Sequence, residues 1–178
     1  LYVAQSIIFA LFVSILVAFL GINTSAFFLS VMGSDAASIN LSKDYLDVIF
    51  YGTAIFMVQI SLNGTLNAQG DTKSYRNVLI AGFFLNIVLN PLFIFGYGFV
   101  PAFGISGLAI ATVVAQSLGL FYLIYKVNSC KLRNYLKLEC FIPKIQLIKD
   151  LASQSFPIVF SVLFIGIGIF VILYFILN

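Results

Sequence analysis

Four stretches of the chain contain no Asp, Glu, Lys or Arg, and they limit what the chain can fold into. They cover residues 1–34, 48–70, 77–125 and 151–178. A transmembrane helix needs about 20 apolar residues, so each stretch is long enough to cross a bilayer. Charged residues make up 8% of the chain, whereas a typical soluble domain has about 25%. The sequence therefore predicts an integral membrane protein embedded in a lipid bilayer.

The uncharged stretches divide into five predicted helical spans. Residues 77–125 are too many for one span, and the Gly and Pro residues of GYGFVPAFG at 96–104 predict a tight turn that divides them. The predicted spans are 7–31, 47–66, 77–96, 104–125 and 154–177. We therefore expect an all-α polytopic helix bundle. Because the chain starts with Leu1 and ends at an apolar helix, we also expect it to be a fragment of a larger membrane protein.

The basic residues predict the orientation of these spans. Of the nine Lys and Arg residues, Lys43 lies between the first two spans, and the other eight lie in the second and fourth connections. Short loops rich in Lys and Arg stay on the cytoplasmic side of a membrane. The first span is therefore expected to run from inside to outside, most simply in a plasma (inner) membrane.

The fourth connection, residues 126–150, carries six of the basic residues. We interpret it as a solvated linker, and the alternative is a weak contact with anionic lipid headgroups. Apolar residues near helical spacing in PKIQLIKDLA, 143–152, predict a short helix lying on the membrane before the fifth span. Cys130 and Cys140 are expected to stay reduced in the cytoplasm. The chain has no His and no CxxC, so no zinc site is expected.

Two asparagines interrupt the third span in LNIVLNPLFIF, residues 85–95. Asn86 and Asn90 are four residues apart and share one helix face. Pro91 has no N–H, so it frees the carbonyl of Ile87. Such a polar patch must meet another helix, water or a ligand instead of lipid. The patch is either an interhelical contact or a set of oxygen ligands for a cation.

Two more spans carry polar faces. Thr112 and Gln116 lie one turn apart in the fourth span, and Gln59 and Asn63 form a similar pair in the second span. These side chains either bond to neighbouring helices or line a cavity. A stripe of small residues, predicted to allow close helix contact, repeats every four residues beside them: Gly107, Ala111, Ala115 and Gly119. Three polar faces favour a bundle with a polar interior, as in a transporter or channel.

Motifs of catalysis and nucleic-acid binding are not visible. The sequence shows no nucleophile–base pair, no phosphate-binding loop and no metal motif, so neither an enzyme nor a bound cofactor is expected. The turn-rich segment NGTLNAQGDTKSYRN, 63–77, contains Asp71 and Thr72, which are expected to cap the next helix.

Three segments resemble the multidrug and toxic compound extrusion (MATE) family: NGTLNAQGDTKSYRN, LNIVLNPLFIFGYG and FGISGLAIATVVAQ. The resemblance is close over residues 45–127 and looser over the first span. It implies a twelve-helix transporter with two six-helix halves around a central cavity, of which this chain holds about helices three to seven. Residues 1–125 would be four helices of the first half, 126–152 the basic cytoplasmic loop between halves, and 153–178 the first helix of the second half.

The resemblance also implies a function. Such proteins are secondary antiporters that export small organic cations or drugs in exchange for sodium or protons. The family's first-half ion site includes an Asp on helix one, and its other members correspond to Asn86, Asn90 and Thr112. Gln59, Asn63 and Gln116 are then candidates for lining the cavity. The family usually has Asp where this chain has Asn90, and an amide keeps one oxygen ligand but has no proton to exchange.

Two other functions are compatible with parts of the sequence. A flippase for lipid-linked oligosaccharides, from the same superfamily, should have a cationic cavity, and no Lys or Arg lies inside the predicted spans. A structural or receptor bundle would show no ion-dependent flux, and its polar faces would not need to converge.

Overall fold

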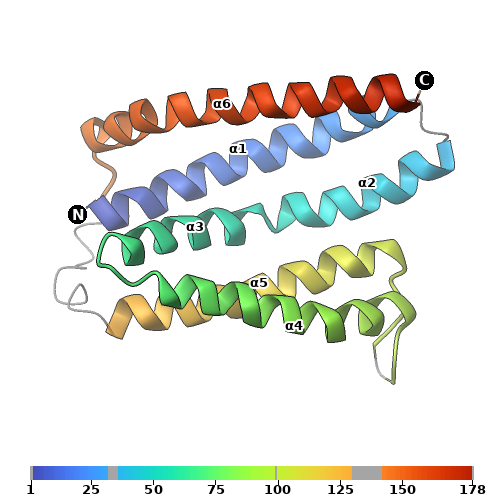
Figure 1. Cartoon of the computed structure of the whole chain (residues 1–178), viewed down its shortest axis with the longest axis horizontal. Helices are drawn as coiled ribbons and strands as arrows, with labels where there is room; N and C mark the ends of the chain where they lie inside the picture. Colours follow the sequence, from blue (N-terminus) through green and yellow to red (C-terminus); the bar gives the residue numbers. More distant parts are fainter. Residues whose placement is uncertain (1, 32–35, 99, 130–141, 178) are drawn as a thin grey trace.

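The computed structural model describes residues 2–31, 36–98, 100–129 and 142–177 (Figure 1). These residues form six helices: α1 (Tyr2–Val31), α2 (Ala36–Tyr51), α3 (Thr53–Asn67), α4 (Lys73–Phe95), α5 (Ile105–Ser129) and α6 (Ile145–Leu177). Cys130 and Cys140 fall outside the described residues, so their expected environment stays a prediction.

The helices account for the five predicted spans. Within the described residues, α1, α4, α5 and α6 are each long and apolar enough to cross a bilayer, and α2 with α3 makes a fifth candidate that is bent by 45°. The turn predicted at 96–104 is also present. Two N–H groups of this turn close it, because Phe103 donates to the Phe93 oxygen at 2.9 Å and Gly104 donates to the Ile94 oxygen at 3.2 Å.

The bundle is organised around α5. This helix packs against α4, α3 and α2, whereas α1 packs against α2, α3 and α6 (Figure 1). A cluster of buried apolar side chains joins α3, α4 and α5: Leu62, Leu66, Val78, Leu123 and Val127. Large apolar side chains elsewhere are mostly exposed, especially along α6, as expected for surfaces that meet hydrocarbon or other helices.

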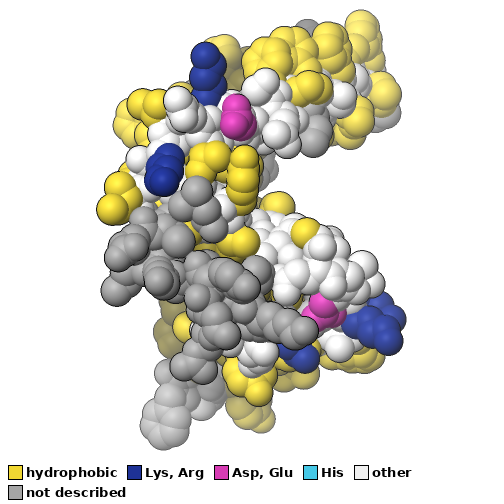
Figure 2. Space-filling view, turned by 90° about the vertical axis from the view of Figure 1, so that its left-hand side faces the viewer, with side chains coloured by type: hydrophobic (Ala, Val, Ile, Leu, Met, Phe, Trp, Pro, Cys, Tyr) yellow, Lys and Arg dark blue, Asp and Glu magenta, His cyan; other side chains and the backbone are white. Residues whose placement is uncertain are grey.

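One end of the bundle carries most of its described positive charge. The N terminus, the α3–α4 turn, the end of α5 and the start of α6 lie together at this end (Figure 1). We call it the basic end, defined by Lys73, Arg76, Lys126, Lys144 and Lys149. Figure 2 looks onto this end and shows dark-blue basic side chains on it. The clustering matches the alternation of charge expected from the sequence.

The second span begins earlier than predicted. The helix that leads into the span predicted at 47–66 starts at Ala36, and this helix, α2, includes the charged residues Lys43 and Asp47. Those charges pair with each other instead of ending the helix, since Lys43 Nζ lies 2.6 Å from Asp47 Oδ2. The bend falls at Gly52, where a Cβ would lie 2.6 Å from Val113 of α5. Thr53 also donates its hydroxyl to the Ile49 oxygen at 3.3 Å, a bond that bends helices.

The last helix is also longer than predicted. The separate helix expected at 143–152 is the first part of one continuous helix, α6, and Pro157 lies inside it without ending it. α5 runs to Ser129 and α6 starts at Ile145, so helix covers both ends of the connection predicted at 126–152. Proline removes one helix bond but is tolerated in membrane helices. The sequence offered no stop signal between Asp150 and the apolar run that would have separated two helices.

Candidate functional site

Two close contacts fix the register between α4 and α5. A Cβ at Gly107 would lie 2.5 Å from the backbone oxygen of Phe93, and a Cβ at Gly119 would lie 2.5 Å from Val78 Cγ1. The two helices therefore run antiparallel in direct contact. Ala111 and Ala115, between these glycines, are at most 2% exposed. The prediction that the small-residue stripe packs closely against another helix is confirmed.

This register brings Thr112 level with the asparagine patch. Asn86 lies about midway between Val78 and Phe93 on α4, and Thr112 lies about midway between Gly107 and Gly119 on α5. Thr112 and Gly119 are seven residues apart and so share a helix face. A Cβ at Gly119 would also meet Gln59 Nε2 of α3 at 2.7 Å. Thr112 therefore lies on the face of α5 where α3 and α4 come together.

The asparagine oxygens point into the protein. Asn86 Nδ2 donates to the Gly82 oxygen of its own helix at 2.9 Å, so its carbonyl oxygen is directed away from that bond. Asn86 Oδ1 and Asn90 Oδ1 are both buried and have no hydrogen-bond partner. Buried polar atoms are normally satisfied, and an exception requires an explanation. These two oxygens are available to bind a ligand.

Two other groups add oxygen acceptors near this face. Pro91 lies inside α4 and has no N–H, so the Ile87 carbonyl loses its helix donor. Thr112 donates its hydroxyl to the Leu108 oxygen at 3.0 Å, which leaves the lone pairs of the hydroxyl oxygen free to accept or to bind a cation. Amide, carbonyl and hydroxyl oxygens are the ligands of hard cations.

The second polar pair takes a different arrangement. Gln59 is 3% exposed and donates to the backbone oxygen of Gln116 at 3.4 Å, so its amide joins α3 to α5. Asn63, one turn further along α3, has a buried Oδ1 without a partner. The structure thus brings Gln59 and Gln116 together. The cavity-lining role of Gln59, Asn63 and Gln116 stays a prediction.

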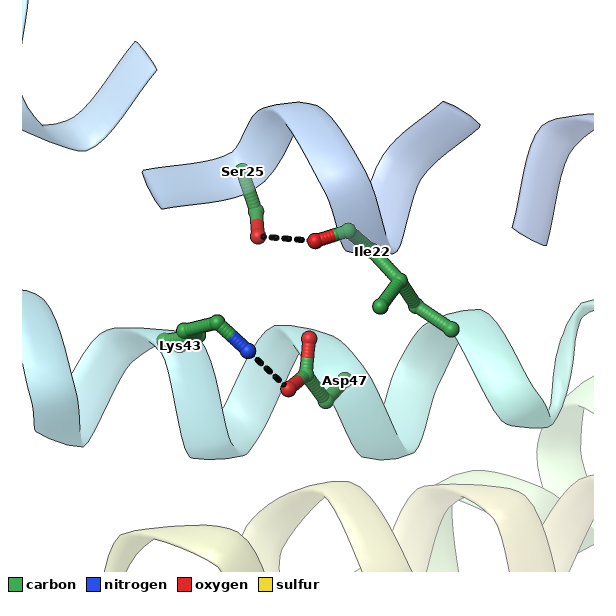
Figure 3. Close-up of polar contacts among 4 residues, drawn as sticks. All are labelled: Ile22, Ser25, Lys43 and Asp47. Atoms are coloured by element: carbon green, nitrogen blue, oxygen red, sulfur yellow. Dashed lines mark hydrogen bonds and ion pairs between the residues drawn. The ribbon is translucent and has the colours of Figure 1, made fainter. Parts of the chain in front are cut away.

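Sequence reasoning missed one polar group. Asp47 Oδ1 is the fourth buried side-chain atom without a partner in the described residues, while its Oδ2 pairs with Lys43 (Figure 3). Ser25 of α1 lies across from this pair and donates to the Ile22 oxygen at 3.3 Å. The Lys43-to-Asp47 spacing of four residues was the available signal, but the predicted span started at 47.

The fold and the buried amides together define a class of protein. No three His, Cys, Asp or Glu side chains gather within the described residues, so a cation here would depend on neutral oxygen ligands. The chain is a polytopic helical membrane protein whose helices bury unpaired amide oxygens. The chain belongs to the MatE family, whose family model matches residues 1–92.

Curated relatives agree with this assignment. The chain is 35% identical to the FAD transporter of Shewanella oneidensis over 101 residues, which are 54% of this chain and 22% of that protein. It is 34% identical to the probable multidrug resistance protein NorM of Thermotoga maritima over 120 residues, 65% of this chain and 25% of that protein. A match to the probable multidrug resistance protein YoeA of Bacillus subtilis reaches 27% identity over 77% of this chain and 31% of that protein.

A solved structure shows the same fold. It is described as the inward-facing conformation of a multidrug resistance MATE family transporter of the MOP superfamily. The two structures superpose with a TM-score of 0.75 at 24% identity, over 87% of this chain and 34% of that chain. The matched region therefore covers between 22% and 34% of the three relatives and the solved structure named here.

Proposed function

We propose that this chain supplies part of the first half of a secondary antiporter that exports small organic cations in exchange for sodium or protons. The single observation that carries the proposal is the pair of buried, unpartnered oxygens on Asn86 and Asn90. They lie one turn apart, next to the carbonyl freed by Pro91 and level with Thr112. A sodium ion bound there would satisfy oxygens that the described protein leaves unpaired.

The neutral amide at position 90 favours sodium over a proton at this patch. An amide can donate an oxygen to a metal ion but cannot take up a proton near neutral pH. Sodium coupling through Asn86, Asn90 and Thr112 is therefore the form of antiport that these side chains support best. The basic end is expected to face the cytoplasm, so that α1 runs from inside to outside.

The test is sodium-driven efflux by the full-length protein in proteoliposomes, with ethidium as the transported organic cation. Asn90→Leu removes one oxygen ligand but suits an apolar helix, so the fold should survive while the sodium concentration for half-maximal efflux rises about tenfold or more. Asn23→Leu is the matched control. Asn23 also donates to the carbonyl four residues earlier, Phe19, at 2.7 Å, but it is exposed. Unaltered sodium dependence in Asn90→Leu would show that the patch is only an interhelical contact.

The substrate class is tested separately from coupling. One relative is named a FAD transporter, and FAD is an anion, so efflux of FAD is measured beside ethidium. A flippase for lipid-linked oligosaccharides is the other alternative, and it needs cationic groups in the cavity. The extended α2 places Lys43 within the second span, but Asp47 pairs with it. Sodium-dependent movement of ethidium, without movement of FAD, supports the proposed substrate class.

A further inference from the structure

A second surface of the α4–α5 pair forms a groove away from the asparagine patch. Its volume is about 360 Å³, and its walls include Asn77, Gly82 and Leu85 from α4 and Ala115, Leu118 and Tyr122 from α5. Asn77 and Leu85 are eight residues apart, so the groove extends about 12 Å along the helix axis. Most of its lining is apolar, and its polar residues, Asn77 and Tyr122, lie toward the basic end.

The groove opens onto an apolar surface. Leu118, in its wall, is 50% exposed, and the neighbouring side chains Phe121 and Phe84 are 68% and 62% exposed. Such a surface on a membrane helix meets either hydrocarbon or another helix, and the proposal below takes it to meet hydrocarbon. Gly82 widens the groove, because a Cβ placed there would have no other atom within 4 Å. The space is thus large enough for an alkyl chain and continuous with the expected lipid phase.

Two basic side chains contact the residues that form the polar end of the groove. Arg76 Nη2 donates to Asn77 Oδ1 at 3.4 Å, and Lys126 Nζ lies 5.6 Å from the centre of the Tyr122 ring. Lys73 adds a third positive charge one turn before Asn77. Asp71, in the adjacent turn, keeps its negative charge and interacts with Lys126, so it offsets one of these three positive charges. The polar end of the groove therefore has an excess of positive charge.

We propose that this groove binds one anionic phospholipid. An acyl chain lies between Gly82 and Leu118, and the headgroup phosphate is held at the membrane surface by Arg76 and Lys126. The complementarity is of two kinds, apolar along the helices and ionic at their ends. A soluble anion would leave the apolar part of the groove empty, and a neutral lipid would leave the basic side chains without a negative charge. The groove shares Gly82 with the asparagine patch, because Asn86 donates to the Gly82 oxygen. Lipid binding in the groove does not require a cation at the patch, so lipid retention and sodium dependence are measured as separate properties.

The test measures lipid retained by the purified full-length protein, by native mass spectrometry, after addition of phosphatidylglycerol, phosphatidylcholine or inorganic phosphate. We expect one phosphatidylglycerol to be retained in preference to phosphatidylcholine. Removing one juxtamembrane cation should weaken that binding about fivefold, so Arg76→Gln and Lys126→Gln should each do so. Lys149→Gln, at the same end but on α6, should leave it unchanged. Equal retention of both lipids, or no effect of either substitution, would overturn the proposal.

A groove-filling substitution tests the apolar part. Gly82→Leu should abolish retention of phosphatidylglycerol, whereas Gly64→Leu on α3, where a Cβ also meets no atom within 4 Å, should not. If Gly82→Leu does not fold, Ala81→Leu fills the same groove from an exposed position. Inorganic phosphate that displaces the lipid completely would show that only the headgroup binds. If Gly82→Leu lowers the melting temperature of lipid-free protein while Gly64→Leu does not, another helix fills the groove and the proposal is wrong.

Discussion

Gln5, in the first turns of α1, holds Lys144, which directly precedes α6. The Gln5 side chain accepts a hydrogen bond from the Lys144 N–H at 2.9 Å and donates one to the Ile142 oxygen at 2.8 Å. Gln5 itself is fully buried. One side chain therefore satisfies both a backbone donor and a backbone acceptor on either side of Pro143. Through this contact the base of α6 is fixed to α1, although most of α6 has an exposed surface.

Gln5→Leu should release the base of α6. The substitution leaves the Lys144 N–H and the Ile142 oxygen without this partner, and the loss of one hydrogen bond typically costs about 0.5–1.5 kcal/mol. We expect faster amide hydrogen exchange in residues 142–148 and a lower melting temperature of the full-length protein. Gln69→Leu is the control, because Gln69 is exposed and its side chain donates within its own helical turn, to the Thr65 oxygen at 3.1 Å. Equal exchange in both variants would show that this contact does not hold α6.

Gly107→Ala should destabilise the α4–α5 contact. The new Cβ would lie 2.5 Å from the Phe93 oxygen, and backbone cannot move aside as a flexible side chain can. Overpacking of this kind costs about 1–3 kcal/mol. Gly82→Ala, on α4, places its Cβ in open space and should keep or raise stability, since Ala favours helix over Gly by about 0.8–1.0 kcal/mol. The measurement is the melting temperature of each purified variant. If Gly107→Ala melts no lower than Gly82→Ala, the α4–α5 contact at Gly107 has room for a methyl group.

Features that depend on local pattern were predictable from the sequence. The apolar stretches gave the five spans, and the four-residue spacings placed Asn86 with Asn90 and aligned the small-residue stripe. These follow from helix periodicity and from the length of chain that crosses a bilayer. Close packing of the small-residue stripe on α5 was predictable without knowing its partner, because small residues on one face allow close contact with any neighbouring helix.

Features that depend on distant contacts were not predictable. The bend at Gly52 requires Val113 of α5 close beside it, and Gln5 meets a segment more than 130 residues away. The predicted span starts at Asp47, next to the uncharged stretch 48–70, whereas α2 starts at Ala36. The ion pair of Asp47 with Lys43, one helical turn earlier on α2, allows both charged residues to stay within the helix. In each case the partner is set by how the helices pack, which a single sequence does not specify.

Asp71→Ala should loosen the start of α4. The sequence predicted caps from both Asp71 and Thr72, but Thr72 makes no side-chain cap bond, while Asp71 Oδ1 accepts from the Ser74 N–H at 3.0 Å. The Ser74 hydroxyl, the Ser74 N–H and nearby Lys126 lower the pKa of Asp71. We expect faster hydrogen exchange in residues 73–77 of the variant than in the wild type.

The same carboxylate gives a pH dependence with a defined sign. Because the folded-state pKa of Asp71 is depressed, its stabilisation is present above the unfolded-state pKa and is lost as pH falls through the folded value. The wild-type advantage over Asp71→Ala should therefore be constant from pH 5 to pH 8 and should shrink below about pH 4. A constant advantage down to pH 2, measured by the difference in melting temperature, would show that the charge of Asp71 is irrelevant.

Asn90→Asp should introduce a titratable group into the oxygen patch of Asn86 and Thr112. In the wild type, neither amide nor hydroxyl exchanges a proton near neutral pH, so sodium binding at the patch should not vary with pH. A carboxylate at 90 adds a negative charge beside the bound cation, and protonation removes that charge. The variant should therefore bind sodium more tightly than the wild type at high pH, and this gain in affinity should disappear as pH falls.

The measurement is the sodium concentration for half-maximal efflux between pH 5.5 and pH 8.5, in proteoliposomes of the full-length protein. Asn86→Asp is the companion variant, because its oxygen is also buried and unpartnered and lies one turn earlier on the same face. Both variants should acquire the pH dependence if both oxygens bind the ion. Exposed Asn23→Asp should not acquire it. If the Asn90→Asp profile stays flat like that of Asn23→Asp, position 90 does not contact the coupling ion, and its buried oxygen belongs to helix packing.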